Sequence, residues 1–249
     1  MEEIITLSKN NIKDEHICCA ISDKKCRAGY EAKKEWLSGQ FDQGMVFKKL
    51  DVRGKVFIEY IPAEYAWAPV VAPGCMMINC FWVSGQYKGK GNGKRLLQEC
   101  IRDSEGKNGI VAISSEKKQP FLSDPKFFKK QGFELVDTAL PYFQLWFLPL
   151  KKNVPHPQFK ERAKHGVCDH KDGIAVYFSN GCPFTEYYVK ELEAIAVRKG
   201  FKILSVRIEN MEQAQNHFVP FTIYSVFLHG KFVTQHILNE KYFDKFIQH

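Results

Sequence analysis

A glycine-rich, basic loop carries the strongest chemical signal in the sequence. It reads Gln86-x-x-Gly89-x-Gly91 and lies between an apolar segment, which predicts a strand, and an amphipathic segment, which predicts a helix. Glycines let main-chain N–H groups approach a phosphate closely, and the N-terminus of a following helix adds a favourable dipole. Four basic residues and no acid lie between positions 88 and 95. The loop therefore predicts a pyrophosphate site, with a solvated basic turn as the alternative if the loop is taken alone.

Two other phosphate-binding motifs fit the loop less well. A dinucleotide fold needs a third spaced glycine in the first strand–helix–strand unit of the chain, whereas this loop follows several strands of antiparallel type. A nucleotide kinase loop needs Gly-Lys followed by Ser or Thr, and here Gly93-Lys94 is followed by Arg95.

Acidic residues and a cysteine near the apolar strand are candidates for proton or group transfer. Glu59 and Glu64 lie on or just after the preceding predicted strand, and either could serve as a general base. A solvent-facing position on the strand is the alternative for Glu59. Asp124 before Pro125 is more typical of a helix N-cap. Cys80, in the middle of the strand, is more typical of a small packed hydrophobe than of an acyl-accepting nucleophile.

A second cysteine of interest, Cys182, lies in the sequence Cys182-Pro183-Phe184-Thr185 before a predicted helix. A thiolate at a helix N-terminus is stabilised by the helix dipole, so we expect a lowered pKa. Thr185 stands where a dithiol enzyme would carry its second cysteine, which excludes a dithiol cycle. His165, Cys168 and His170 fit no structural zinc spacing, and we therefore predict no metal.

The elements that must position these residues form two series separated by an irregular segment. The first series predicts strands at 4–7, 44–50, 55–61, 76–83, 110–113, 133–136 and 142–150, and helices at 26–39, after residue 93 and at 125–131. The second predicts strands at 174–178, 201–208, 223–228 and 231–234, and helices at 184–199 and 240–247. We therefore expect α/β domains at 1–150 and 173–249, joined by a linker at 151–172.

Composition sets the class of protein. Of 249 residues, 45% are hydrophobic and 26% charged, which is typical of a globular chain. The net charge of +8 is spread over both halves, so we predict no nucleic-acid partner. No secretory signal or long apolar run occurs at the N-terminus or elsewhere, so we predict no membrane association. Eight cysteines are too few for a disulfide scaffold, which favours the cytoplasm.

Beyond the loop, the order of elements and the run Phe127-Phe128-Lys129-Lys130-Gln131-Gly132-Phe133 resemble the GNAT acyltransferase superfamily, over about Ile4 to Leu150. The segments Ile78–Val83, Lys118–Asp124 and Cys182–Thr185 resemble the YoaP-like acetyltransferases, which join a GNAT domain to a small C-terminal domain. The second resemblance spans almost the whole chain.

The resemblance implies a GNAT fold with a central mixed sheet and direct transfer of an acetyl group from acetyl-CoA to an amine of a small molecule or peptide. It implies that strand 76–83 splays from strand 110–114 and pairs with the pantetheine arm. Phe128 stands where the family commonly has a tyrosine that protonates the leaving thiolate, so solvent is expected to do so here. The implied acetyl-CoA contacts are Phe81, Val83, Gln86, Tyr87, Lys88, Gly89, Lys90, Gly91, Asn92, Gly93 and Lys94.

The C-terminal elements resemble a small thioredoxin-like domain that opens with Cys182. Val219-Pro220 stands where that fold has a cis-proline facing the active cysteine. The domain is expected to cover or supplement the site. Two alternatives to the acetyltransferase remain: a non-catalytic CoA-binding or thiol-sensing protein, and a monothiol redox protein that uses Cys182. GNAT domains often pair, but the sequence leaves a homodimer open.

Overall fold

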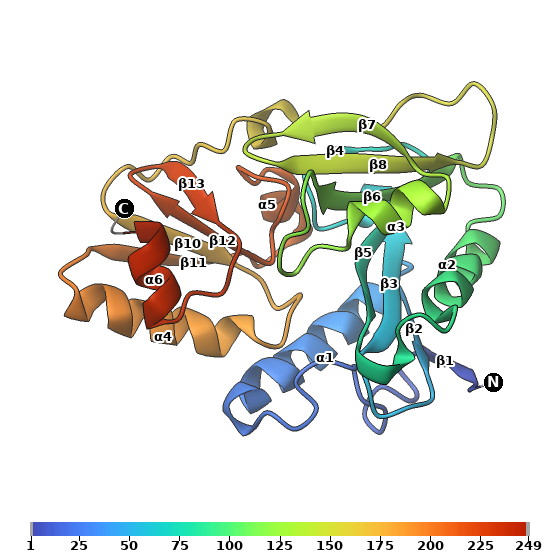
Figure 1. Ribbon diagram of the computed structural model, residues 1–249, viewed down its shortest axis with the longest axis horizontal. Helices are drawn as coiled ribbons and strands as arrows, with labels where there is room; N and C mark the ends of the chain where they lie inside the picture. The colour runs from blue at the N-terminus through green and yellow to red at the C-terminus, as the bar shows by residue number, and fades with distance from the viewer. Residues whose placement is uncertain (1, 248–249) are drawn as a thin grey trace.

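The computed structural model describes residues 2–247 and contains two main sheets (Figure 1). The larger sheet has seven strands in the order β1-β2-β3-β5-β6-β8-β7, and its β5 and β6 are parallel while its other neighbours are antiparallel. This mixed sheet confirms the predicted α/β fold class. Its strands are β1 (Ile4–Leu7), β2 (Val46–Leu50), β3 (Val56–Pro62), β5 (Cys75–Val83), β6 (Gly109–Ser115), β7 (Glu134–Ala139) and β8 (Phe143–Pro149).

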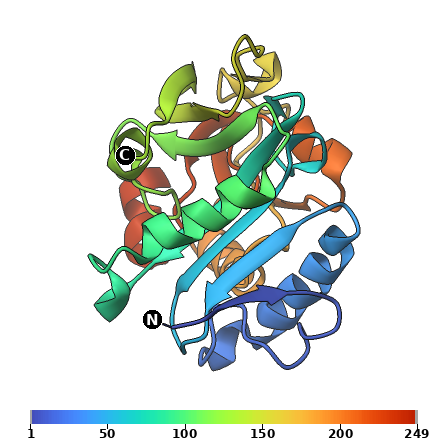
Figure 2. The ribbon, with the colours of Figure 1, turned by 90° about the vertical axis from the view of Figure 1, so that its right-hand side faces the viewer.

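Helices cover both faces of the large sheet. α2 (Asn92–Asp103) and α3 (Pro125–Lys130) pack on one face of the sheet. α2 buries Leu96, Leu97 and Cys100 as a single stripe, and α3 buries Phe128 in the same core. α1 (Arg27–Phe41) buries Leu37 against the opposite face. In Figure 2, α2 lies in front of the sheet and the C-terminal elements lie behind it. A buried hydrophobic core therefore lies on each side of the sheet.

The C-terminal part forms a four-stranded sheet in the order β11-β10-β12-β13, with β10 parallel to β11 and antiparallel to β12. One face packs against two helices, and the other contributes Ala175 and Phe227 to the core shared with the large sheet. The elements are β10 (Ile174–Phe178), α4 (Thr185–Arg198), β11 (Ile203–Arg207), α5 (Met211–Gln215), β12 (Tyr224–Leu228), β13 (Lys231–Thr234) and α6 (Glu240–Ile247).

The prediction of a cis peptide before Pro220 is wrong. Within residues 2–247 the cis peptide bond is Leu140–Pro141, and Val219–Pro220 is trans. Val219 and Pro220 are buried where the loop before β12 meets the large sheet. The trans peptide therefore lies in a buried junction between the two sheets, and a local sequence motif does not reveal this packing.

The segment at 151–172 covers the junction of the two sheets. It contains β9 (Gln158–Phe159), which pairs with β4 (Val70–Val71), and the buried ring of Phe159 enters the shared core. Neither short strand was expected from the sequence, because each is only two residues long. The domain limits at 150 and 172 remain predictions.

Short 3-10 turns occupy Lys24–Cys26, Ala63–Tyr65, Gly85–Tyr87 and Glu161–Ala163. Among the described residues, no helix is both long and apolar enough to cross a bilayer.

Candidate active site

The two central parallel strands separate part of the way along their length. β5 and β6 pair from Cys75 opposite Gly109 to Ile78 opposite Ala112, and the pairing stops there although β5 runs on to Val83. On the other edge of β5, the register with β3 passes from Cys80 to Ile78, so that Asn79 has no partner. An extra residue of this kind bends the strand. The bulge at Asn79 therefore coincides with the point where the sheet opens.

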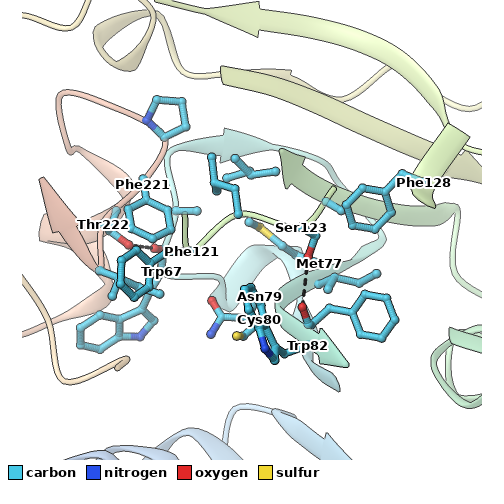
Figure 3. Close-up of a pocket in the computed structure, with 18 residues that line it drawn as sticks. Trp67, Met77, Asn79, Cys80, Trp82, Phe121, Ser123, Phe128, Phe221 and Thr222 are labelled. Carbon is cyan, nitrogen blue, oxygen red and sulfur yellow. Dashed lines mark hydrogen bonds between the residues drawn. The ribbon is translucent and has the colours of Figure 1, made fainter. Parts of the chain in front are cut away.

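A pocket occupies this opening (Figure 3). The space between its lining atoms is about 560 Å³, a volume that includes open solvent. The loop Pro220–Ile223 of the C-terminal part forms one wall, so both parts of the chain build the pocket. The lining residues are Trp67, Ala68, Met77, Ile78, Asn79, Cys80, Phe81, Trp82, Ala112, Ile113, Phe121, Leu122, Ser123, Phe128, Pro220, Phe221, Thr222 and Ile223.

Ser123 bridges the two separated strands. Its hydroxyl donates to the carbonyl oxygen of Phe81 on β5 at 3.2 Å, and its own carbonyl accepts from the hydroxyl of Ser114 on β6 at 2.6 Å. The bond to Ser123 shows that the Phe81 carbonyl points into the opening. Because alternate residues direct their main-chain groups to the same strand edge, those of Val83 face the same way. The main-chain groups of Phe81 and Val83, the two contacts predicted on this strand, thus face the opening between β5 and β6.

The glycine-rich loop follows β5 directly and leads into α2. Gly89 and Gly91 have φ angles of +74° and +78°, which a side chain would strain, and an added Cβ at either would meet nothing within 4 Å. Within residues 2–247, no protein acceptor binds the N–H groups of residues 89–93. Lys88, Lys90 and Lys94 form no ion pair there either. The loop presents unpaired N–H groups and positive charge, the requirements of an anion site.

The loop also contains contacts that shape it internally. The side chain of Asn92 donates to the carbonyl of Tyr87 at 3.0 Å, which closes the turn before α2. An added Cβ on Gly93 would come 3.2 Å from the ring of Phe127 and 3.4 Å from that of Phe81, so the first turn of α2 packs closely over β5 and α3. Gln86 and Lys88 are exposed beside this turn. These contacts fix the loop between the end of β5 and the start of α2.

Glu59 is buried in an ion pair. Its two carboxylate oxygens lie 2.6 and 3.1 Å from the ammonium nitrogen of Lys33 on α1, and the Glu59 side chain is 1% exposed. The ring of Trp36 lies 4.3 Å from the same ammonium. Glu59 is opposite Cys80 in the β3–β5 register, and Cys80 lines the pocket. The alternative of a solvent-facing Glu59 is therefore wrong, because α1 covers this face of the sheet.

The structure does not bring Glu64 to the pocket. β3 runs antiparallel to β5, so Val56 lies opposite Val83 at the open end and Pro62 lies opposite Met76 at the far end. Glu64 follows Pro62, and its carboxylate accepts the N–H of Gly74 at 2.6 Å. Its position corrects the expectation that it could serve as the base. Asp124 caps α3 by accepting the N–H of Lys126, as expected.

The expected lowering of the Cys182 pKa is wrong. Burial raises the pKa of the Cys182 thiol to about 12, with a further contribution from the neighbouring Cys19. α4 begins at Thr185, and a backbone hydrogen bond from Phe184 lowers the pKa by less than burial raises it. Burial also raises the pKa of Cys80 well above its usual range. Both thiols are therefore poor nucleophiles at neutral pH, which agrees with the packing role expected for Cys80.

Phe128 on α3 is 1% exposed and lines the pocket. The position where the family commonly has a tyrosine therefore faces the pocket. Of the loop aromatics, Trp67 and Phe121 line the pocket, whereas Tyr65 does not. Figure 3 shows Phe128 on the side of the pocket opposite Trp67 and Phe221. The pocket thus extends from α3 to the C-terminal part.

Sequence reasoning missed several residues of the site. Asn79 and Trp82 lie on the predicted strand next to named residues, but the bulge that aims Asn79 depends on the pairing with β3. Ser123 belongs to the segment Lys118–Asp124, which resembles the YoaP-like acetyltransferases but to which no function was assigned from the sequence. Lys33 lies on α1, far from Glu59 in sequence. Its only signal was a lysine on a helix that has charged faces.

Comparison with known proteins agrees with this geometry. The profile of the "Acetyltransferase (GNAT) family" matches residues 11–133, and the "YoaP-like" profile matches residues 203–245. A Bacillus subtilis (strain 168) protein named "Uncharacterized N-acetyltransferase YoaP" is 43% identical over 245 residues, covering 98% of this chain and 97% of that protein. The chain belongs to the GNAT acetyltransferase family, and it carries the YoaP-like C-terminal region.

Solved structures give weaker likenesses. A GNAT-family acetyltransferase from Desulfovibrio desulfuricans matches with 14% identity and a TM-score of 0.43, over 60% of this chain and 100% of that one. A GNAT-family acetyltransferase from Brucella melitensis in complex with acetyl-CoA matches with 15% identity and a TM-score of 0.40, over 63% of this chain and 92% of that one. The family assignment rests on the Bacillus subtilis relative and the profiles.

Proposed function

We propose that this N-acetyltransferase binds acetyl-CoA in the opening between β5 and β6 and transfers the acetyl group directly to an amine. The observation that carries the proposal is the opening between β5 and β6, which contains the pocket. The chain runs from the end of β5 directly into residues 89–93, whose N–H groups have no acceptor within the described residues. The pyrophosphate would lie on residues 86–94, with the dipole of α2 behind it. The pantetheine arm would pair with main-chain groups of Phe81 and Val83, and the thioester would then reach the pocket.

Direct transfer forms an amide bond to the acetyl carbon and breaks the carbon–sulfur bond of the thioester. The acceptor must arrive as a neutral amine, so its ammonium proton has to be taken up by a base. We propose Glu59 for this role, because it is the carboxylate whose strand position lies beside a pocket residue, Cys80. Both oxygens already accept from Lys33, so the proton would travel through water between Glu59 and the amine.

The leaving group is the CoA thiolate. The phenyl ring of Phe128 has no proton to donate. A thiolate is stable enough to depart without an acid, and solvent at the open end of the pocket supplies its proton. Transfer is therefore expected to be slower than in a relative with a tyrosine at this position.

We also propose that the C-terminal part has a thioredoxin-like fold that serves as a cover. Its sheet order β11-β10-β12-β13, with one parallel pair and two antiparallel pairs, and the helix between β10 and β11 support this assignment. The loop Pro220–Ile223 supplies a wall of the pocket. The raised pKa of Cys182 favours this covering role over monothiol redox chemistry.

The test is product analysis by mass spectrometry. The wild-type protein is incubated with acetyl-CoA and a mixture of primary amines, and both the acetylated amine and free CoA are quantified. We expect the two products in equal amounts. Release of CoA without an acetylated amine would show hydrolysis instead, and intact acetyl-CoA with every amine would overturn the proposed transfer.

A further inference from the structure

The pocket has aromatic walls contributed by both parts of the chain. Trp82 comes from β5, Trp67 and Phe121 come from loops of the large-sheet part, and Phe221 comes from the C-terminal part. Figure 3 shows Trp67, Phe121 and Phe221 gathered on one side, facing Asn79, Cys80 and Trp82 across the space. Flat, apolar surfaces of this kind favour an aromatic or aliphatic body, because such a body loses contact with water without losing hydrogen bonds.

The pocket offers no charge to an acceptor. None of its 18 lining residues carries a formal charge. The neighbouring carboxylate, Glu59, is neutralised by Lys33 at 2.6 Å. A polyamine or an aminoglycoside brings several ammonium groups, and each one that enters would lose water without gaining a counterion. The walls therefore select against polycations as well as favouring apolar groups.

Two hydroxyl groups that line the pocket already have partners within the protein. The hydroxyl of Thr222 donates to the carbonyl of Trp67 at 2.5 Å, and the hydroxyl of Ser123 donates to Phe81. The indole N–H of Trp67 donates to Gln40 at 3.0 Å, which points it away from a ligand. Trp67 also packs edge-on against Trp36, with ring centroids 5.3 Å apart. The aromatic wall is thus held in place before any ligand arrives.

From these observations we infer that the acceptor is a monoamine whose remaining part is apolar and about the size of an aromatic ring, and that aromatic side chains from both parts of the chain hold it. The inference rests on the proposed acetyl transfer and adds the substrate class. One amine is left for the reaction, and the rest of the molecule lies against the walls. The class includes aryl-alkyl amines, and it excludes acceptors that carry several positive charges.

The test compares kcat/KM for 2-phenylethylamine, n-hexylamine, spermine and kanamycin, with the acetylated product quantified by mass spectrometry. We expect the kcat/KM values of 2-phenylethylamine and n-hexylamine to exceed those of spermine and kanamycin by at least about tenfold, because a single apolar group in a hydrophobic pocket changes discrimination by about 10–200-fold. Equal or better rates with the polycations would overturn the inference. If no amine is acetylated although acetyl-CoA binds, the proposed transfer itself fails.

Two variants at Phe121 sharpen the test, since this ring lines the pocket and is 39% exposed. Phe121→Ala is expected to lower kcat/KM for 2-phenylethylamine by about tenfold, from the lost apolar area. The matched control is Tyr65→Ala, because Tyr65 is a 42% exposed loop aromatic outside the pocket. This control is expected to change the rate less than twofold. An equal loss in both variants would overturn the inference.

Phe121→Glu adds the missing charge. A carboxylate on the wall attracts a second ammonium group, so we expect the ratio of the spermine to the n-hexylamine kcat/KM to rise by about tenfold over wild type. Circular dichroism and the Kd for acetyl-CoA, both expected to match wild type, confirm that the variant is folded. An unchanged ratio in a folded variant would show that Phe121 does not face the acceptor.

Discussion

Removing one charge of the buried ion pair between Lys33 and Glu59 should destabilise the folded protein strongly. The two side chains are 4% and 1% exposed, and the ammonium lies within hydrogen-bond distance of both carboxylate oxygens. Glu59→Gln keeps the shape but leaves the Lys33 ammonium buried without a counterion. Removing one partner of such a pair costs about 3–5 kcal/mol. For a chain of this size that corresponds to a fall of roughly 6–20 °C in Tm.

Differential scanning calorimetry of three variants checks this magnitude. Lys33→Met combined with Glu59→Gln removes both charges, so we expect most of the lost Tm to return. The matched control is Asp42→Asn, because the Lys9–Asp42 pair has a similar distance of 2.6 Å but side chains that are 50% and 62% exposed. An exposed pair contributes less than about 1 kcal/mol. A Glu59→Gln variant as stable as Asp42→Asn, or a double variant no better than the single one, would refute the reasoning.

The same variants separate the structural role of Glu59 from its proposed role as a base. If Glu59 only holds the fold, the double variant should regain acetyl transfer together with its stability. If Glu59 takes the amine proton, the double variant should be stable but slower than wild type by about 100-fold or more, at an unchanged Kd for acetyl-CoA. Recovery of the wild-type kcat would remove Glu59 from the mechanism.

Three further outcomes follow from the structure. Burial raises the pKa of Cys182 to about 12, so the rate of its alkylation should rise about tenfold per pH unit from pH 7 to 10. Mass spectrometry of the peptide that contains Cys182 measures this rate, and a plateau near pH 7 would contradict the raised pKa. Burial lowers the pKa of His217 to about 3, below its unfolded value, so the folded state binds fewer protons and stability should fall as the pH drops from 6.5. The loss at pH 5 is about 2 kcal/mol, and it should be absent in His217→Gln, as measured by urea unfolding. Ser123→Ala frees the Phe81 carbonyl for pantetheine, so the Kd for acetyl-CoA should fall by up to about fivefold, whereas a weaker complex would show that the hydroxyl itself binds the ligand.

Features set by local sequence were predictable. The apolar run at 76–83 became β5, and the glycine pattern became a loop with positive φ angles at Gly89 and Gly91 before α2. Asp124 became the cap of α3. In each case the residues that decide the structure lie within a few positions of one another, so a motif contains the information.

Features set by contacts between distant segments were not predictable. The bulge at Asn79 depends on the register with β3, and the ion pair of Glu59 depends on where α1 packs. The wall at Phe221 depends on how the two sheets share a core. The error for Cys182 has the same origin, because a helix dipole is visible in the sequence whereas burial by a neighbouring segment is not. The local sequence therefore located the glycine-rich loop but not the pocket.

Calorimetric titration with acetyl-CoA tests most directly whether the glycine-rich loop binds this ligand. It compares wild type, Gly89→Trp and the matched control Gly106→Trp. Gly89 and Gly106 have φ angles of +74° and +80° with nothing within 4 Å of an added Cβ, so both variants carry a similar backbone strain of about 1–2 kcal/mol. We predict that wild type and Gly106→Trp bind acetyl-CoA with the same Kd and that Gly89→Trp does not bind it. Equal binding by all three proteins, or none by wild type, would contradict the account.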